Sequence, residues 1–177
     1  MCIRDRLELV RRRCRAFRAQ AVANVIHGLG VLCADKGAGD VDAETVGELM
    51  LAVEKNAGEL KAQEVANVYN GLTKLPAAVG AMSPERWRRL SEAASRLAPE
   101  MNSQNIANVL NALGKIDAAE RAVSSGTGWS RLIEAAERRA PEMNAQEIAN
   151  TLNALGKIDA AERAVSSGAG WSRLIGV

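Results

Sequence analysis

The sequence has few of the residues from which catalytic and metal sites are built. Its 177 residues include one histidine, His27, and three cysteines, Cys2, Cys14 and Cys33, at no spacing typical of metal ligands. No apolar run reaches the length of a membrane-spanning helix, and the unpaired cysteines favour an intracellular compartment over a secreted disulfide scaffold. We therefore expect no metal, no cofactor, no small-molecule substrate, no membrane partner and no enzymatic activity.

Aromatic residues make up only 3% of the chain, but hydrophobic residues make up 47%, which excludes a disordered or collagen-like chain. The net charge of +2 conceals an asymmetry. Residues 1–18 carry seven Arg against two acidic residues, whereas the remaining 159 residues carry 16 basic and 19 acidic residues. Because proteins that bind phosphates usually present a basic surface, this balance argues against strong non-specific binding to nucleic acid.

A tandem repeat of 41–43 residues organises the sequence. Residues 101–133 and 143–175 match at 29 of 33 positions, as expected after a recent duplication. Older copies share the word Gln-x-x-Ala-Asn, and its four occurrences follow one another at 43, 41 and 42 residues. Periods of this size are typical of solenoids, in which each unit is one pair of elements that buries its apolar face against its neighbours. The sequence thus predicts an all-α fold, an α-solenoid of about four two-helix repeats.

Both ends of the chain suggest a fragment. Residues 1–6 can be encoded by the transposon end used to build sequencing libraries, read in frame, so we interpret them as a sequencing artefact; a genuine basic arm is the alternative. Residues 170–175 repeat the words with which residues 128–133 open a helix. We expect a single array over residues 7–177. Its units are about 7–42, 43–83, 84–127 and 128–169, with the start of a fifth at 170–177.

Each unit is predicted to contain two helices. Ser83 followed by Pro84 is a helix start, and Pro99 and Pro141 end the first helices because proline disfavours helical geometry in the residue before it. Asn144 with Glu147 forms a candidate capping box for a second helix. The first helices are expected near 7–16, 43–59, 84–98 and 128–140. The second helices are expected near 19–34, 61–75, 102–116 and 144–158, and the Asp-Ala-Ala-Glu words after the last two can add a helical turn.

The second helices place amides on one face. At about 100° per residue, Gln104, Asn108 and Asn111 fall on one side of their helix and the apolar residues on the opposite side. Small residues on both flanks predict close packing against neighbouring second helices, so that the amide side stays free. We call the residues on this side the amide rows: Gln20, Asn24 and His27; Gln63, Asn67, Asn70 and Lys74; Gln104, Asn108, Asn111 and Lys115; Gln146, Asn150, Asn153 and Lys157.

The amide rows have two interpretations. Carboxamides donate and accept hydrogen bonds at once, which suits them to base edges of an extended single strand. Alternatively, they bond along the helix or between adjacent repeats and form a ladder with no ligand. His27 has no carboxylate or cysteine at partner spacing, and we interpret it as a surface variant of Asn.

Residues 107–115, Ala-Asn-Val-Leu-Asn-Ala-Leu-Gly-Lys, and their copy at 149–157 resemble the Leu-Ala-Asn-x-Leu-Trp-Ala-Leu-Ala-x-Leu core of octotricopeptide repeats and of related arrays that often precede a RAP domain. The resemblance implies paired-helix repeats that bind single-stranded RNA in a plastid or mitochondrion, with the amide rows as the binding residues. This sequence has Asn or His where the family has tryptophan, a longer connector at 117–127, and no visible RAP domain.

A second resemblance implies a protein partner instead. Thr73-Lys74-Leu75-Pro76 is similar to the Ser-Lys-Trp-Pro word of repeats in effectors of bacterial plant pathogens, which act on host proteins. An ordinary helix end followed by proline gives the same four residues. A protein-interaction scaffold is therefore the alternative to RNA binding.

The tryptophans and the N-terminal arginines have simpler interpretations than ligand binding. Trp87, Trp129 and Trp171 recur at 42 residues on the apolar side of the first helices, where packing is expected rather than base stacking. The arginines between Arg11 and Arg18 surround a helix and are expected on a solvated face, with phosphate contact as the alternative.

Overall fold

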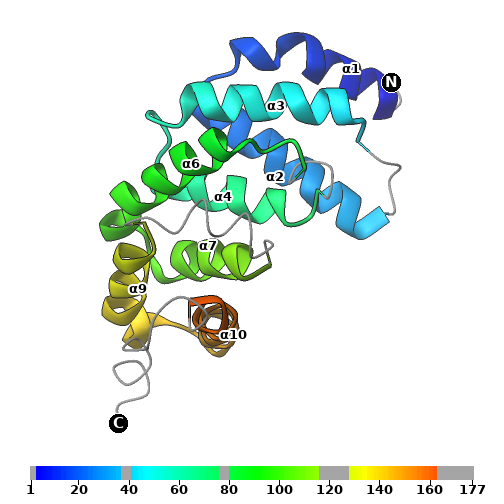
Figure 1. The fold of residues 1–177 in the computed structure, drawn as a ribbon. Helices are drawn as coiled ribbons and strands as arrows, with labels where there is room; N and C mark the ends of the chain where they lie inside the picture. The colour runs from blue at the N-terminus through cyan, green and yellow to red at the C-terminus, as the bar shows by residue number, and fades with distance from the viewer. Residues whose placement is uncertain (1–2, 37–40, 76–79, 116–127, 163–177) are drawn as a thin grey trace.

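The computed structural model describes residues 3–36, 41–75, 80–115 and 128–162, and these residues form helices without strands (Figure 1). The α-helices are α1 (Ile3–Arg13), α2 (Ala19–Lys36), α3 (Ala43–Asn56), α4 (Ala62–Leu72), α6 (Pro84–Leu97), α7 (Ser103–Lys115), α9 (Gly128–Arg139) and α10 (Ala145–Glu162). Short 3₁₀ turns follow three of them: η1 (Cys14–Ala16), η2 (Ala98–Glu100) and η3 (Ala140–Glu142). The predicted all-α solenoid is confirmed.

The helices form two rows. The first-helix row contains α1, α3, α6 and α9, and the second-helix row contains α2, α4, α7 and α10. Within the second-helix row, α2 packs on α4, α4 on α7, and α7 on α10, while α3 packs on α6 and α6 on α9 in the other row. In Figure 1, α4 lies along the plane of the view whereas α10 is seen nearly end-on, so that the stack twists from one unit to the next.

Local signals in the sequence explain where the helices start and stop. The Asp42 carboxylate accepts a hydrogen bond from the Thr45 N–H (2.8 Å) and begins α3, and Ser83 caps α6 in the same way. The predicted capping box of α10 is confirmed, since Asn144 and Glu147 exchange bonds of 2.9 and 3.0 Å. α6 and α9 end in the 3₁₀ turns that contain the two prolines, as expected.

Most predicted boundaries agree with the structure to within a few residues. α10 runs through Glu162 and so includes the expected extra turn, whereas the equivalent turn after α7 lies outside the described residues. α3 ends at Asn56 rather than at residue 59, and the buried Asn56 amide donates to the Ala52 and Phe17 carbonyl oxygens (2.8 and 3.2 Å) where the chain turns. α1 begins at Ile3 rather than at residue 7 and contains part of the segment interpreted as an artefact.

The core lies between the two rows. Trp87 on α6 contacts Tyr69 on α4 with ring centroids 6.5 Å apart, and both are fully or almost fully buried. The Tyr69 hydroxyl and the Ser91 hydroxyl share a hydrogen bond of 3.3 Å, and burial raises the pKa of Tyr69 to about 12. Trp129 is also buried, so the packing interpretation of the tryptophans is confirmed for the two described ones; Trp171 lies outside the described residues.

Candidate ligand-binding surface

The structure places the amide rows on the outer side of the second-helix row. None of their members is buried, and all four glutamines are exposed. The opposite sides of the same helices are in the core, as Val65, Ile106 and Leu110 are fully buried. The amides therefore face outward, as the helical spacing predicts.

Small residues bring adjacent rows close together, which confirms the predicted close packing at two interfaces. A Cβ added to Gly71 of α4 would lie 2.7 Å from the Ile26 carbonyl oxygen of α2, and one added to Gly30 would lie 3.1 Å from the Gly71 Cα. A Cβ added to Gly114 of α7 would lie 2.9 Å from the Ala154 Cα of α10. A side chain at Gly71 or Gly114 would therefore collide with the neighbouring helix, so the close approach of these rows requires glycine there.

Most amides of the rows do not bond to one another. Among the described residues, the one hydrogen bond between members of the rows runs from Gln146 Nε2 to Asn150 Oδ1 (3.0 Å). The pairs at the same spacing on α2, α4 and α7 make no such bond. Of the described helices, α10 alone therefore has a hydrogen bond along its amide row.

His27 occupies in α2 the position that Asn70 and Asn111 occupy in α4 and α7, and both of these asparagines are half-buried. The side chain of His27 is also half-buried, and its Nδ1 is enclosed without a hydrogen-bond partner among the described residues. The exposure of His27 thus matches that of the two asparagines, and the enclosed Nδ1 is what distinguishes it.

The described side chains of the second-helix row include few charges, and those at the ends of the amide rows are lysines. Lys74, Lys115 and Lys157 each end a row and are half-buried or exposed. Among the second-helix side chains that the structure describes, the carboxylates are Glu64 and Glu147, and both accept a bond from the backbone N–H at the start of their helix (2.9 and 3.0 Å). Both carboxylates described on the second helices are therefore bonded at the helix starts.

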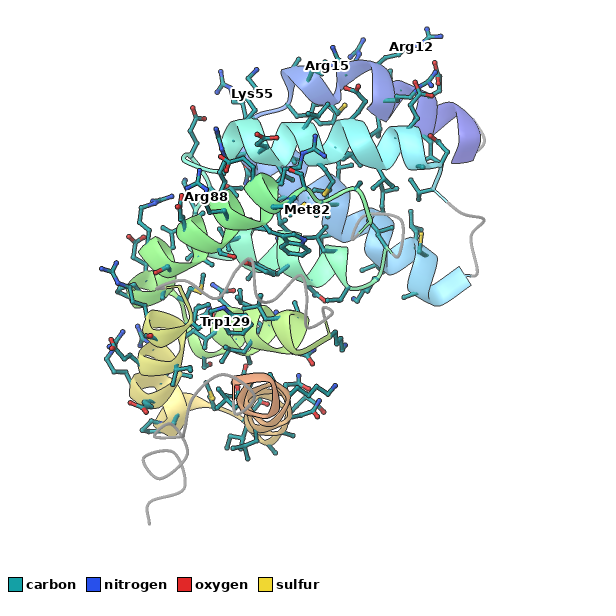
Figure 2. The ribbon with its side chains drawn as sticks, in the orientation of Figure 1. Arg12, Arg15, Lys55, Met82, Arg88 and Trp129 are labelled. Atoms are coloured by element: carbon teal, nitrogen blue, oxygen red, sulfur yellow. The ribbon has the colours of Figure 1, made fainter. Side chains whose placement is uncertain are left out.

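The first-helix row carries most of the charged side chains instead (Figure 2). Figure 2 shows Arg12, Arg15, Lys55 and Arg88 pointing outward from this row. Arg15 of η1 makes two bonds of 2.6 Å to Glu48, and Arg11 of α1 pairs with Glu44, so both α1 and η1 are joined to α3. Arg15 stays on a solvated face, since its side chain is 75% exposed, whereas Arg11 is 32% exposed; each of the two also meets a carboxylate from the next unit, which the sequence did not predict.

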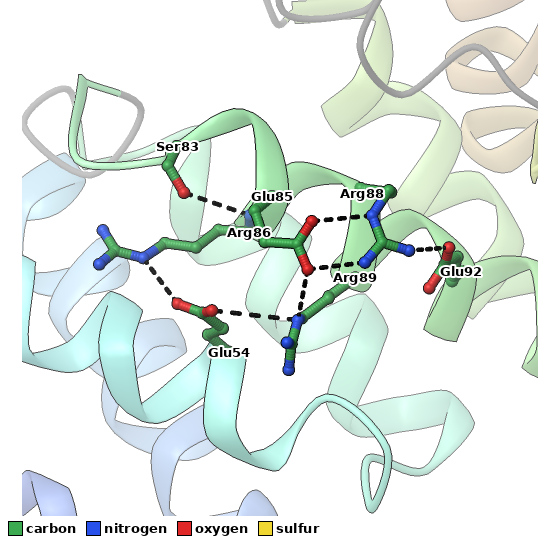
Figure 3. A network of polar contacts seen from close by, with 7 residues as sticks. All are labelled: Glu54, Ser83, Glu85, Arg86, Arg88, Arg89 and Glu92. Atoms are coloured by element: carbon green, nitrogen blue, oxygen red, sulfur yellow. Dashed lines mark hydrogen bonds and ion pairs between the residues drawn. The ribbon is translucent and has the colours of Figure 1, made fainter.

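A network of ion pairs connects α3 with α6 (Figure 3). Glu85 accepts from Arg88 and Arg89 (2.6 and 2.8 Å), which lowers the pKa of Glu85 to about 2, and hydrogen bonds to Glu85 and Glu92 raise the pKa of Arg88. Glu54 of α3 bonds to Arg86 at 3.1 Å. An open cavity of about 550 Å³ lies beside this network, lined by Lys55, Arg96 and neighbouring residues. The sequence analysis predicted neither the network nor the cavity. The signal for the network is that Glu and Arg recur three and four residues apart between residues 85 and 92.

Comparison with known proteins gives one match. A family profile described as "Protein of unknown function (DUF1601)" matches residues 5–26, 47–68, 88–110 and 130–152. The matched segments make up half of the chain and recur at the period found in the sequence. The chain belongs to the DUF1601 family. No curated protein and no solved structure matches it.

Each DUF1601 segment covers the same part of a unit in the structure. It begins within the first helix, passes through the turn, and ends within the second helix. The segment therefore includes the first Gln and Asn of every amide row, such as Gln104 and Asn108, and excludes the later members, such as Asn111.

The DUF1601 units show no metal cluster in their described part. Within residues 3–36, 41–75, 80–115 and 128–162, no group of three or more His, Cys, Asp or Glu side chains could hold a metal ion. None of the helices over the same residues combines the length and the apolar character needed to cross a membrane. Cys14 is buried, and burial raises the pKa of its thiol, which disfavours the nucleophilic thiolate.

Proposed function

We propose that the chain binds single-stranded RNA through the amide rows. The observation that carries the proposal is that four successive helices present outward amides at one repeated position, with neighbouring backbones in direct contact at two of the interfaces. Such a surface offers a donor and an acceptor at regular intervals along a line. Unstacked bases present the complementary edges in an extended single strand.

The charges of the rows are consistent with this partner. Lysines at the ends of three rows can contact phosphates, and the carboxylates described on the second helices are held at the helix starts. With three lysines, binding is expected to be moderately salt-dependent. The resemblance of residues 107–115 to octotricopeptide repeats supports the same partner and an organellar location.

Fluorescence anisotropy with short labelled single-stranded RNAs of different sequence tests the proposal. We expect sequence-dependent binding that weakens with salt, by a logarithmic slope of about 0.7 for each phosphate neutralised. Replacing Asn108 and Asn150 together by Ala should weaken binding about tenfold or more, because one bidentate amide contact is worth about 1–3 kcal/mol. Replacing Lys115 and Lys157 by Ala should instead reduce the salt slope.

Matched controls lie on the first-helix row. Ser130 and Glu134 are exposed on α9, away from the rows, and S130A and E134Q should bind RNA as the parent chain does. If no RNA binds at low salt, or if the double Asn variant binds unchanged, the proposal is wrong. The first of these results favours the protein-interaction scaffold.

A further inference from the structure

The two ends of the stack leave open the faces that the interior interfaces bury. On α10, Ile148 is 42% exposed and Ala149 and Gly156 are exposed. The equivalent residues of α7, namely Ile106, Ala107 and Gly114, are buried. The residue types at these positions are the same on both helices. The difference in exposure therefore arises because α7 packs against α10, whereas no described helix packs on the far side of α10.

The opposite end of the stack shows the complementary face. A Cβ added to Gly28 of α2 would meet nothing within 4 Å, whereas its equivalents Gly71 and Ala154 lie against the preceding second helix. Val25 and Leu29 are half-buried and Leu32 is 36% exposed. A glycine inside a helix costs about 1 kcal/mol relative to alanine, and no contact among the described residues explains Gly28.

The interior interfaces show how the two faces would meet. Two contacts define the register: Gly30 lies against Gly71, and Gly114 lies against Ala154. In each pair, the first residue comes ten positions after the Gln of its own row, and the second comes eight positions after the Gln of the next row. By the same register, Gly156 of α10 would lie against Gly28 of α2. The residues at these positions on both end faces are uncharged: Ile148, Ala149, Leu152 and Gly156 on α10, and Val25, Gly28, Leu29 and Leu32 on α2.

We propose that the chain associates head to tail with further copies of itself, α10 of one copy packing on α2 of the next. The contact continues the interface that already joins α7 to α10, and it does not depend on RNA binding. The two contacting faces differ, so the association is heterologous, and each assembly keeps one free α2 face at one end and one free α10 face at the other.

Sedimentation velocity over a range of concentrations, with variants blocked at one end, tests this contact. Ala149→Arg blocks the α10 face and Gly28→Arg blocks the α2 face, and both side chains have room in the single chain. The parent chain should form dimers and larger species as its concentration rises. Each variant alone should stay monomeric, whereas an equimolar mixture should give a species of twice the mass of one chain and nothing larger, because each variant keeps one intact face.

The control variant is Leu51→Arg, which replaces an apolar residue 41% exposed on α3 and should associate as the parent chain does. Circular dichroism should show the parent helix content in all three variants. A parent chain that is monomeric at every concentration overturns the proposal. A mixture of the two blocked variants that remains monomeric, or variants that associate alone, also overturns it.

Discussion

α7 and α10 have nearly the same sequence and occupy different environments. Ile106 is 0% exposed on α7, and Ile148 at the same position of α10 is 42% exposed. Ala107 and Ala149 differ in the same way. The two helices start from equivalent asparagine caps, Asn102 and Asn144. The comparison shows that helix formation is set within each unit, whereas burial is set by the presence of the next unit.

The largest expected difference between the two helices is in core truncation. Ile106→Ala removes a fully buried side chain and should lower the free energy of unfolding by about 2–5 kcal/mol. Ile148→Ala removes a partly exposed one and should cost about 1 kcal/mol. Chemical denaturation of both variants measures the two values, and equal losses would show that Ile148 is covered.

Replacing the equivalent glycines Gly114 of α7 and Gly156 of α10 by alanine should change the free energy of unfolding in opposite directions. Gly114→Ala places a Cβ 2.9 Å from the Ala154 Cα, which forces α7 and α10 apart and should destabilise by about 1–3 kcal/mol. Gly156→Ala adds a methyl group to an exposed helical position and should stabilise by about 0.5–1 kcal/mol. Thermal unfolding provides the measurement. A gain in stability for both variants would contradict the close contact.

Removing the helix caps should affect both helices alike. Asn102→Ala removes the bond to the Asn105 N–H, and Asn144→Ala removes the bond to the Glu147 N–H. Each substitution should cost about 1 kcal/mol, because a cap acts within its own first turn. Denaturation of the two variants checks this. A much smaller cost for Asn144→Ala would mean that α10 forms less completely than α7.

The smallest expected effect is a dependence of stability on pH, and it concerns α6, the first helix of the unit that contains α7. On α6, Glu85 accepts from two arginines and has a pKa of about 2, below its ordinary value of 4.5. Since the folded pKa is lowered, its contribution to stability is present above about pH 4.5 and is lost as the pH falls toward 2. NMR titration should show Glu85 titrating near pH 2 and, in Arg88→Gln, at a higher pH. An unchanged midpoint in that variant would exclude Arg88 as a cause.

Much of the fold could be predicted because its signals are local. The Asn144–Glu147 box, the Ser83 cap and the two prolines each act within a few residues of the helix ends that they set. The outward direction of the amides also follows from spacing along one helix.

The remaining features depend on neighbours distant in sequence. The Arg11–Glu44 and Arg15–Glu48 pairs join residues 33 positions apart, and they form because the stack places α3 beside α1. The enclosed Nδ1 of His27 and the open Gly28 likewise depend on how α2 packs and on where the stack ends. Periodicity within a helix contains no information on these contacts.

Hydrogen exchange measured by mass spectrometry on the two nearly identical segments 104–113 and 146–155 tests the central claim most directly. At a concentration where the chain is monomeric, the backbone amides of 146–155 should exchange about tenfold faster or more, since about 1.4 kcal/mol of local stability corresponds to that factor. Equal protection of both segments in the monomer would contradict the claim that the next unit, and not the sequence, determines burial.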